Sequence, residues 1–149
     1  MKIVVQRVKE ASVCVEQCED SKIGQGLLLL IGISKEDKET DILSLTRKVA
    51  HLRIFPDQNN NMNLSCLDVQ GEFLVVSQFT LLSDTKKGHR PSFFNACEPD
   101  LAKKDCEEFV RELKKYGRPV KEGQFGAMMQ VHLINDGPVT IILDSKKGD

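Results

Sequence analysis

Two short polar strings in this sequence carry groups that could act on an acyl substrate. In the first, "SQFT", Ser77 and Thr80 supply hydroxyls and Gln78 supplies an amide. Phe79 adds an aromatic ring and a backbone N–H just after the apolar run "EFLVV". Donors of this kind can stabilise the oxyanion that forms during acyl transfer. A strand that runs out into a polar loop explains the same residues without any activity.

The second string, "NDGPVT" at 135–140, combines a turn dipeptide with a proline. Asp136 and Gly137 are typical of a two-residue hairpin turn. Pro138 removes a backbone donor where the next strand should begin, and X-Pro bonds are the ones that are readily cis. A cis Gly137–Pro138 bond would turn adjacent carbonyls the same way and offer two acceptors to an ammonium group. The alternative is a turn followed by an edge-strand proline.

Conventional catalytic and metal-binding groups have no clear candidates. His51 falls in an expected helix and His132 in an expected strand, and neither has a neighbouring serine or cysteine to activate. Cys14 and Cys18 are four residues apart, but no second Cys/His pair with zinc-site spacing follows. Five cysteines cannot all pair within one chain, which favours reduced thiols in a cytosolic protein. We therefore expect neither a metal nor a cofactor.

The elements that must position these strings form one α/β domain over residues 1–149. A chain of 149 residues with 40% hydrophobic content is the size of one compact domain. Alternating and helical periodicities predict a mostly antiparallel sheet with two main helices. The expected strands are 2–8 and 11–17, joined by a turn at Lys9–Glu10, then 23–34, 71–81, 127–135 and 138–144. The expected helices are 40–52, capped by Thr40 or Asp41, and Pro99–Tyr116, ended by Gly117.

The charge is balanced overall and basic only locally. With 21 basic and 22 acidic residues, the chain lacks the excess of positive charge of a protein that coats nucleic acid. Residues 84–92, here called the basic loop, contain Lys86, Lys87, His89 and Arg90. Any contact with a polyanion is therefore expected at a local cluster such as this one. The N-terminal ten residues carry charges and no long apolar run, so we expect no signal peptide and no membrane span.

Several strings follow the order and total length of a known family. They are "QRV" and "ASV" near the start, then "IGQGLLLLIGI", "LRIF", "MNLS", "GEFLVVSQFTLLSDTKKGHRPSF" and "FGAMMQVHLINDGPVTIILD". In these strings the chain resembles the D-aminoacyl-tRNA deacylases, which hydrolyse the ester between a D-amino acid and the terminal adenosine of tRNA. The resemblance spans nearly the whole chain. It implies a barrel-like core, a two-fold homodimer and a cytoplasmic enzyme whose partner is the acceptor end of aminoacyl-tRNA.

The resemblance also implies a role for the first string. Residues 77–80, beginning with Ser77, would form the floor of the pocket, with Gln78 and the Phe79 N–H as oxyanion donors. Thr80 is a possible nucleophile but lacks a partner base. A family mechanism in which the 2′-hydroxyl of the terminal adenosine assists a water fits that lack better. The cations of the basic loop would lie near the acceptor end.

The second string would read the handedness of the substrate. Gly137 and Pro138 would form a cis element that one subunit inserts into the pocket of the other. Its carbonyls would hold the substrate amino group and leave no room for an L side chain, so that D-amino acids are cleaved. Glycine, including glycine mischarged on tRNA(Ala), would be tolerated because it has no side chain. Arg7 would help to fix this element, and Asn135 would belong to the same substrate-binding set.

Two other functions stay open at this point. A nucleic-acid-binding module could retain the fold without the activity, and it would bind tRNA or DNA with no ester hydrolysis. A hydrolase of another small acyl ester could use Thr80 as its nucleophile. In that case Thr80→Ala would abolish activity, and an acyl-enzyme could be trapped.

Overall fold

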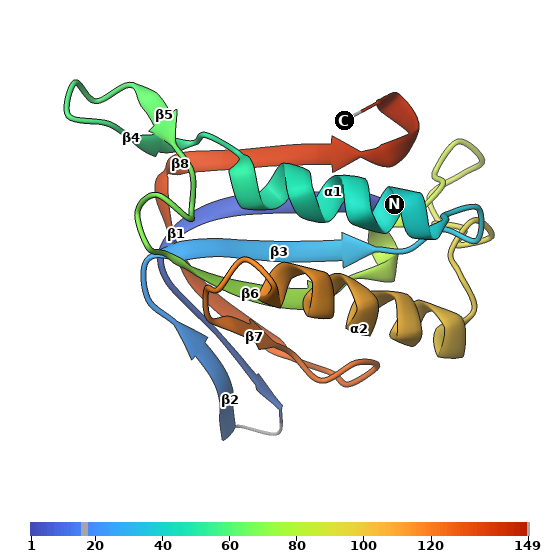
Figure 1. Ribbon diagram of the computed structural model, residues 1–149. Helices are drawn as coiled ribbons and strands as arrows, with labels where there is room; N and C mark the ends of the chain where they lie inside the picture. Colours follow the sequence, from blue (N-terminus) through green and yellow to red (C-terminus); the bar gives the residue numbers. More distant parts are fainter. Residues whose placement is uncertain (16–17, 149) are drawn as a thin grey trace.

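The computed structural model describes residues 1–15 and 18–148. Its elements are β1 (Lys2–Val15), β2 (Cys18–Ile23), β3 (Gly26–Gly32), α1 (Glu39–His51), β4 (Phe55–Pro56), β5 (Met62–Leu64), β6 (Glu72–Ser77), the 3₁₀ helix η1 (Phe79–Leu82), α2 (Pro99–Lys114), β7 (Val120–Glu122), β8 (Gln130–Asp144) and the 3₁₀ helix η2 (Ser145–Lys147). Figure 1 shows the two main helices lying side by side across the sheet. The fold is a single α/β domain with two main helices, as expected.

The sheet is mixed, and it curls toward closure. β1 pairs antiparallel with β2, β3 and β8, whereas the pairs β3–β6 and β6–β7 are parallel. The expectation of a mostly antiparallel sheet is right for the pairs of β1 and wrong for those of β6. β2 and β7 end the strand order, yet the Ser21 hydroxyl donates a hydrogen bond to the Glu122 carbonyl at 2.8 Å. This contact between the end strands makes the sheet a nearly closed, barrel-like structure.

The central strands β3 and β6 are apolar without alternation because both of their faces are covered. Leu27 and Leu29 of β3 belong to the large core beneath the helices. Leu28 of β3 and Leu74 of β6 belong to a smaller core on the other side of the sheet. A continuous apolar run is what parallel strands buried on both faces require. The strings "LLLLI" and "FLVV" therefore predict the centre of the barrel correctly.

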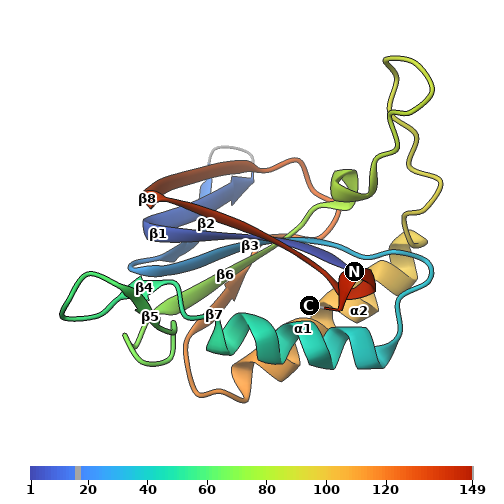
Figure 2. The same ribbon diagram turned by 90° about the horizontal axis from the view of Figure 1, so that it is seen from above.

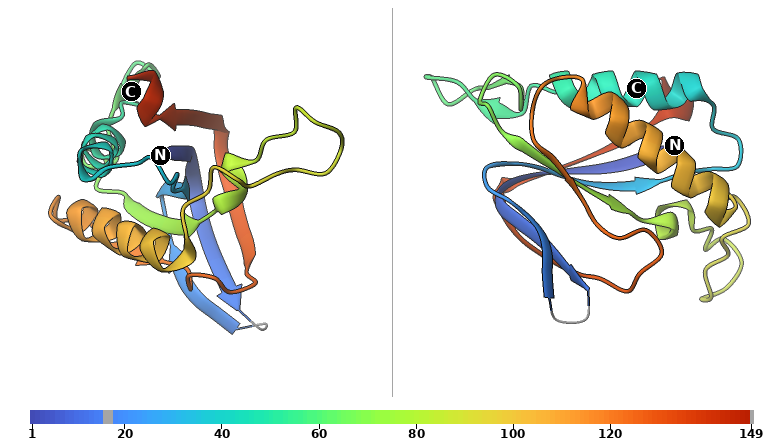
Figure 3. Two further views of the ribbon diagram at one scale, coloured as in Figure 1. Left: turned by 90° about the vertical axis from the view of Figure 1, so that its right-hand side faces the viewer. Right: turned by 60° about the horizontal axis from the view of Figure 1, so that its bottom comes forward.

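Both helices cover the same face of the sheet, as Figures 2 and 3 show. Leu45 of α1 and Phe109 of α2 are fully buried against it. α1 begins at Glu39, so Thr40 lies inside the helix and is not its cap. Asp41 acts three positions into the helix, where its carboxylate accepts a hydrogen bond from the Lys38 N–H at 2.8 Å. No helix within the described residues is long and apolar enough to span a membrane.

β1 is one strand of 14 residues, so the predicted turn at Lys9–Glu10 is wrong. On the β8 side, Val8 pairs with Asn135 and Glu10 pairs with Ile134. Lys9 is therefore an extra residue in β1, which is a β-bulge. A bulge bends a strand and increases its twist without ending it. The extra residue shifts the apolar alternation by one position, which makes one bulged strand look like two.

β8 is also one strand, so the predicted hairpin turn at Asp136–Gly137 is wrong. Gln6 of β1 pairs with Thr140, and Val8 pairs with Asn135, so the single residue Arg7 faces residues 136–139. These four residues bulge out of the ladder, and the chain continues in its original direction. The predicted strands 127–135 and 138–144 are thus the two ends of one bulged strand.

β6 ends at Ser77, earlier than the residue 81 that the sequence suggests. Phe79 and Thr80 lie in η1, a single 3₁₀ turn. The basic loop follows and stands away from the body of the molecule in Figure 2. Its base is closed by a pair of backbone hydrogen bonds between Asp84 and Ser92, at 2.8 and 2.9 Å. The polar string 77–80 therefore lies at the end of the barrel, where β6 ends.

Candidate functional site

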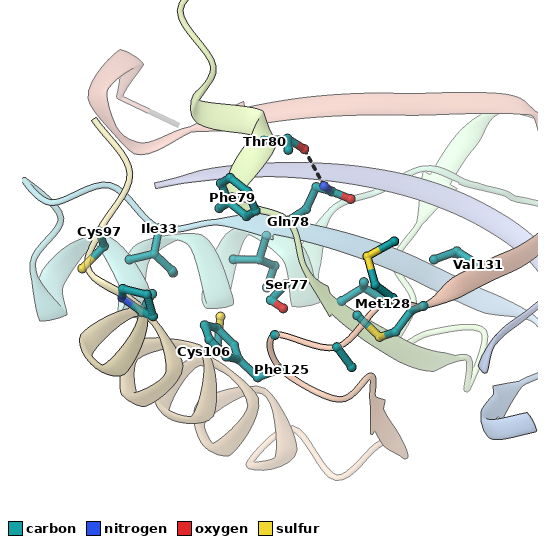
Figure 4. Close-up of a pocket in the computed structure, with 17 residues that line it drawn as sticks. Ile33, Ser77, Gln78, Phe79, Thr80, Cys97, Cys106, Phe125, Met128 and Val131 are labelled. Atoms are coloured by element: carbon teal, nitrogen blue, oxygen red, sulfur yellow. Dashed lines mark hydrogen bonds between the residues drawn. The ribbon is translucent and has the colours of Figure 1, made fainter. Parts of the chain in front are cut away.

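A pocket of about 570 Å³ opens at the end of β6, between η1, α2 and the segment that leads into β8. The four residues of the first string, Ser77, Gln78, Phe79 and Thr80, all line it (Figure 4). Its other lining residues are Ile31, Ile33, Val76, Cys97, Pro99, Ala102, Cys106, Phe125, Gly126, Ala127, Met128, Met129 and Val131. The string therefore meets a mainly apolar wall that is drawn from four separate parts of the chain.

The floor of the pocket is held by the continuation of the β3–β6 ladder. The Gln78 N–H donates to the Ile31 carbonyl at 2.7 Å, which fixes the backbone one residue beyond the strand. The Gln78 side-chain amide donates to the Thr80 hydroxyl oxygen at 2.5 Å. Within the described residues, the Phe79 N–H has no hydrogen-bond acceptor. The first N–H groups of a helical turn have no partner in the turn itself, so this N–H is available to a ligand.

The pocket offers hydrogen-bond donors but no side chain to serve as a base. Among the described residues, neither a charged side chain nor a histidine lines it. Two thiols do, but burial raises the pKa of Cys106 to about 12 and also raises the pKa of Cys97. Both are therefore protonated near neutral pH, and the thiol form is not the nucleophile.

The second string is organised by Arg7, which lies opposite the bulge of β8. Its side chain is 10% exposed. The guanidinium Nε donates to the Asp136 carbonyl at 2.8 Å and forms an ion pair with the Asp136 carboxylate at 3.2 Å. Nη1 donates to the Ile54 carbonyl at 2.5 Å. A planar guanidinium can serve several acceptors at once, so one side chain anchors the bulge to the segment before β4.

Asn135 closes the bulge from the other side. Its Oδ1 accepts a hydrogen bond from the Val139 N–H at 2.7 Å, and its Nδ2 donates to the Val139 carbonyl at 3.2 Å. Between these two residues, Gly137 and Pro138 are exposed and joined by a cis peptide bond, which agrees with the expectation from the sequence. The side chain of Asn135 therefore supports the backbone of the bulge and is not free to bind a ligand with both of its polar atoms.

The two strings lie apart within one chain. Arg7 pairs with Leu27 at the start of β3, whereas Ser77 pairs with Ile31 near the end of β3. The offset of four residues from Leu27 to Ile31 corresponds to about 13 Å along the sheet. Gly137 and Pro138 do not line the pocket. Figure 1 shows the bend of β8 and the end of β6 at opposite ends of the sheet.

The cations of the basic loop are close to the pocket in sequence but do not line it. Lys86, Lys87 and Arg90 are all exposed. They follow η1 and therefore lie at the end of the barrel where the pocket opens. The structure groups the expected residues into three sets: the pocket floor, the bulge of β8 and this exposed loop.

The sequence does not reveal the wall of the pocket. Phe125 lies outside every predicted element, and Met128 and Met129 fall at the start of the predicted strand 127–135, where nothing in the sequence marks them as pocket residues. Cys97 and Cys106 have no distinguishing pattern either, and the one available signal is that "FGAMM" leads into a strand.

Comparison with known proteins gives consistent matches over nearly the whole chain. The family described as D-Tyr-tRNA(Tyr) deacylase matches residues 4–144. A D-aminoacyl-tRNA deacylase of Thermosipho africanus (strain TCF52B) is 55% identical over 147 residues, 99% of each chain. One of Syntrophobacter fumaroxidans (strain DSM 10017 / MPOB) is 52% identical over 147 residues, again 99% of each chain. A solved structure of the c-Myc DNA Unwinding Element Binding Protein superimposes with a TM-score of 0.92 at 45% identity, covering 97% of this chain and 98% of that one.

Proposed function

The chain belongs to the D-Tyr-tRNA(Tyr) deacylase family of hydrolases, and we propose that it cleaves the ester of D-aminoacyl-tRNA in the pocket at the end of β6. The observation that carries the proposal is the composition of this pocket. It combines the Phe79 N–H, which has no acceptor among the described residues, with apolar walls and has no charged lining residue among those described. Such a pocket suits a neutral ester whose carbonyl oxygen becomes negative in the transition state.

The Phe79 N–H and the Gln78 amide are the proposed oxyanion donors. The Phe79 N–H has a fixed direction because the Gln78 backbone is bonded to Ile31 on one side and η1 begins on the other. A donor that is already positioned needs no reorganisation as charge develops. The hydrogen bond to Thr80 orients the Gln78 side chain, and Thr80 thereby acts as a positioning residue.

Water is the proposed nucleophile, activated by the 2′-hydroxyl of the terminal adenosine. The support for this step is the lack of a lining base in the described part of the chain. Thr80→Ala tests the competing mechanism, in which the threonine attacks. We expect the variant to remain active with a reduced rate and to form no acyl-enzyme that mass spectrometry could detect. A trapped ester on Thr80 in the wild-type protein would contradict the water mechanism.

A second copy of the chain is proposed to supply Gly137 and Pro138 to the pocket. Within one chain these residues are exposed and about 13 Å along the sheet from the pocket floor. β8 also has the features of an interface strand, because among the described strands it pairs with β1 alone, which leaves its other edge open. It exposes Ile134 at 51% and Ile142 at 69%. Large apolar side chains along an open strand edge favour association with another protein surface.

Handedness would then be read by the inserted backbone. Carbonyl groups that face the α-carbon hold the substrate ammonium whatever the side chain is, so one site can serve many D-amino acids. An L side chain would point into the rigid insert, and steric exclusion discriminates more strongly than a missing methylene does. Glycine would be accepted, so we propose that glycyl-tRNA(Ala) is a further substrate.

The deciding experiment is a parallel time course of D-tyrosyl-tRNA and L-tyrosyl-tRNA hydrolysis. We expect rapid loss of the D ester, with the L ester lost only at the rate of the enzyme-free control. Gln78→Ala should lower the rate on the D ester by about 100-fold or more, as the loss of an oxyanion donor does in other enzymes. Dilution below the dimer dissociation constant should abolish turnover. Cleavage of neither ester above background would refute the proposed function.

A nucleic-acid-binding module is the second candidate, because one similar solved structure is of a protein named for binding a DNA unwinding element. This candidate predicts binding of tRNA or DNA without ester hydrolysis. The two proposals share one expectation, which is that salt weakens binding if Lys86, Lys87 and Arg90 contact phosphates. They differ in turnover, so the time course above separates them.

A further inference from the structure

An exposed phenylalanine at the base of the basic loop has no packing role in the described structure. Phe94 is 79% exposed, although its neighbour Phe93 is partly buried. Phenylalanine is one of the residues most often found inside, and a ring with this exposure contributes little to a core. Only Met128 is more exposed among the large apolar side chains that the structure describes. The Phe94 ring is therefore accessible to a ligand.

One face of the Phe94 ring carries a positive charge. The Lys35 ammonium lies 3.4 Å from the ring centroid, which is a close cation–π contact. The two residues are joined by the backbone as well, because the Lys35 N–H donates to the Asn95 carbonyl at 3.1 Å. Ser34 and Ala96 form a β-bridge next to this bond. The ring and the cation are thus held together on an ordered backbone, and the second face of the ring is left exposed.

The exposed ring continues the aromatic rim of the pocket. The Phe93 ring packs edge-to-face on the Phe79 ring, with centroids 4.9 Å apart and an interplanar angle of 71°. Phe79 in turn lines the pocket. Phe94 follows Phe93 directly in the chain, so three aromatic residues, here called the aromatic row, lie at the pocket or next to it in sequence: Phe79, Phe93 and Phe94. A polymer whose last unit occupies the pocket could contact this row as it leaves.

The surroundings of the row are cationic, in contrast to the whole chain. Between Asp84 and Phe94 there are three cationic side chains and one anionic side chain, whereas the net charge of the protein is −1. The three cations are exposed on the basic loop, which projects from the body of the molecule (Figure 3). Aromatic rings next to a positively charged path are the pattern that binds single-stranded nucleic acid, with bases stacked on rings and phosphates near cations.

We propose that Phe94, with Lys35 beneath it, is a stacking platform for an unpaired base in the single-stranded 3′ end of tRNA. This base would belong to a nucleotide that precedes the terminal adenosine, and the basic loop would contact its phosphates. The inference rests on the proposed function, since it assumes that the terminal adenosine ester occupies the pocket. It adds a site outside the pocket that recognises RNA and does not touch the scissile ester.

The test compares a substrate that reaches the platform with one that does not. D-tyrosyl-tRNA carries the single-stranded 3′ end, whereas D-tyrosyl-adenosine ends at the pocket. For Phe94→Ala we expect kcat/KM on D-tyrosyl-tRNA to fall by about 5- to 150-fold, the usual range for the loss of one stacked base. The rate on D-tyrosyl-adenosine should not change. Phe94→Trp should restore hydrolysis of the tRNA ester, and Phe94→Leu should not, because leucine has no π face.

Met62→Ala is the matched control, because Met62 is an exposed apolar residue at 58% on the distant strand β5. It should leave the rates on both esters unchanged. Equal loss on both esters in Phe94→Ala, or no loss on D-tyrosyl-tRNA, would overturn the proposal.

Direct binding separates this proposal from the proposed function. A fluorescent tetraribonucleotide that ends in CCA and carries no amino acid should bind the wild-type protein. Phe94→Ala should raise its dissociation constant by about 5- to 150-fold, as for kcat/KM. This measurement requires no hydrolysis. Binding that depends on Phe94 in a protein that cleaves no ester would support the platform and refute the deacylase function. If the protein hydrolyses D-tyrosyl-tRNA but Phe94→Ala binds the oligonucleotide as tightly as the wild type, the deacylase function is supported and the platform is refuted.

Discussion

Gly137→Ala tests the bulge of β8 directly. An added Cβ would lie 2.6 Å from Val139 Cγ2 and 2.8 Å from the Val139 nitrogen, both well inside van der Waals contact. The φ angle of Gly137 is +149°, a region that residues with a Cβ rarely adopt. Val139 is not free to move, because its N–H donates to Asn135 Oδ1 at 2.7 Å. We expect the free energy of unfolding to fall by about 1–3 kcal/mol, as at other overpacked sites.

Gly117→Ala is the control for backbone strain without collision. Gly117 follows α2 with a φ of +74°, and no described atom lies within 4 Å of an added Cβ. A left-handed conformation costs an alanine about 1–2 kcal/mol, so the two variants should lose similar stability in urea unfolding. Their activities should differ. At a temperature where both are folded, Gly117→Ala should keep the wild-type rate on D-tyrosyl-tRNA, and Gly137→Ala should lose about 100-fold, as for other misplaced site groups.

Two outcomes would contradict this reasoning. If Gly137→Ala had the same urea midpoint of unfolding as the wild type, the predicted collision of the new Cβ with Val139 would be wrong. If it lost stability but kept the wild-type rate, Gly137 would have no role in the site, and the proposal that a second chain contributes it would fail.

Three further predictions follow from buried and hydrogen-bonded groups. Arg7→Lys should lose about 1.5–3 kcal/mol of unfolding free energy in urea, because one ammonium cannot replace both carbonyl contacts of the guanidinium. Hydrogen bonds from the backbone N–H and side chain of Ser65 lower the pKa of Asp68 from its ordinary 3.8, so its stabilising effect is present above that pH and is lost in acid. The stability difference between wild type and Asp68→Asn should thus be largest near neutral pH and shrink below pH 3.8. Iodoacetamide at pH 8 should label Cys14 before Cys106, whose pKa burial raises to about 12, as peptide mass spectrometry can show.

The parts of the fold that depend on local pattern could be predicted from the sequence. The helical spacing of Ile42, Leu45 and Val49 predicts α1 to within a residue at each end. The uninterrupted apolar run before Ser77 predicts β6. Gly117 has the positive φ typical of a residue beyond a helix end, although α2 ends at Lys114, two residues before the predicted Tyr116. In each case the periodicity and the stop signal lie within one segment of the chain. Long-range contacts were not needed to see them.

The bulges and the pocket wall could not be predicted in the same way. Lys9 and residues 136–139 read as turns because a bulge and a turn use similar residue types, and only the partner strand shows that the chain continues. The very short strands β4, β5 and β7 have too few residues to show a period. Phe125 and Met128 reach the pocket because β7 pairs parallel with β6 and returns the chain to that end of the sheet. Such pairing is a property of the assembled barrel.

The roles of the two polar strings came from the resemblance and not from side-chain chemistry. The structure shows why, because the side chains of Arg7 and Asn135 form hydrogen bonds with backbone atoms of the bulge. The sequence alone does not distinguish a residue that supports the backbone, such as Arg7 or Asn135, from one that binds a ligand. The separation of Gly137 from Ser77 within one chain was likewise invisible before the strand register was known.

The pairing of β1 with β8 sets the order in which the molecule can be completed. β1 is the first strand and β8 the last, and their ladder joins Lys2 to Asp144 across almost the entire chain. Contacts between residues so far apart in sequence raise the contact order, which slows folding. A nascent chain that has not yet reached Gln130 leaves one edge of β1 without its partner, and an open edge is prone to pair with other chains. The bulge that carries Gly137 and Pro138 can therefore dock on β1 only after the chain has been made as far as Thr140.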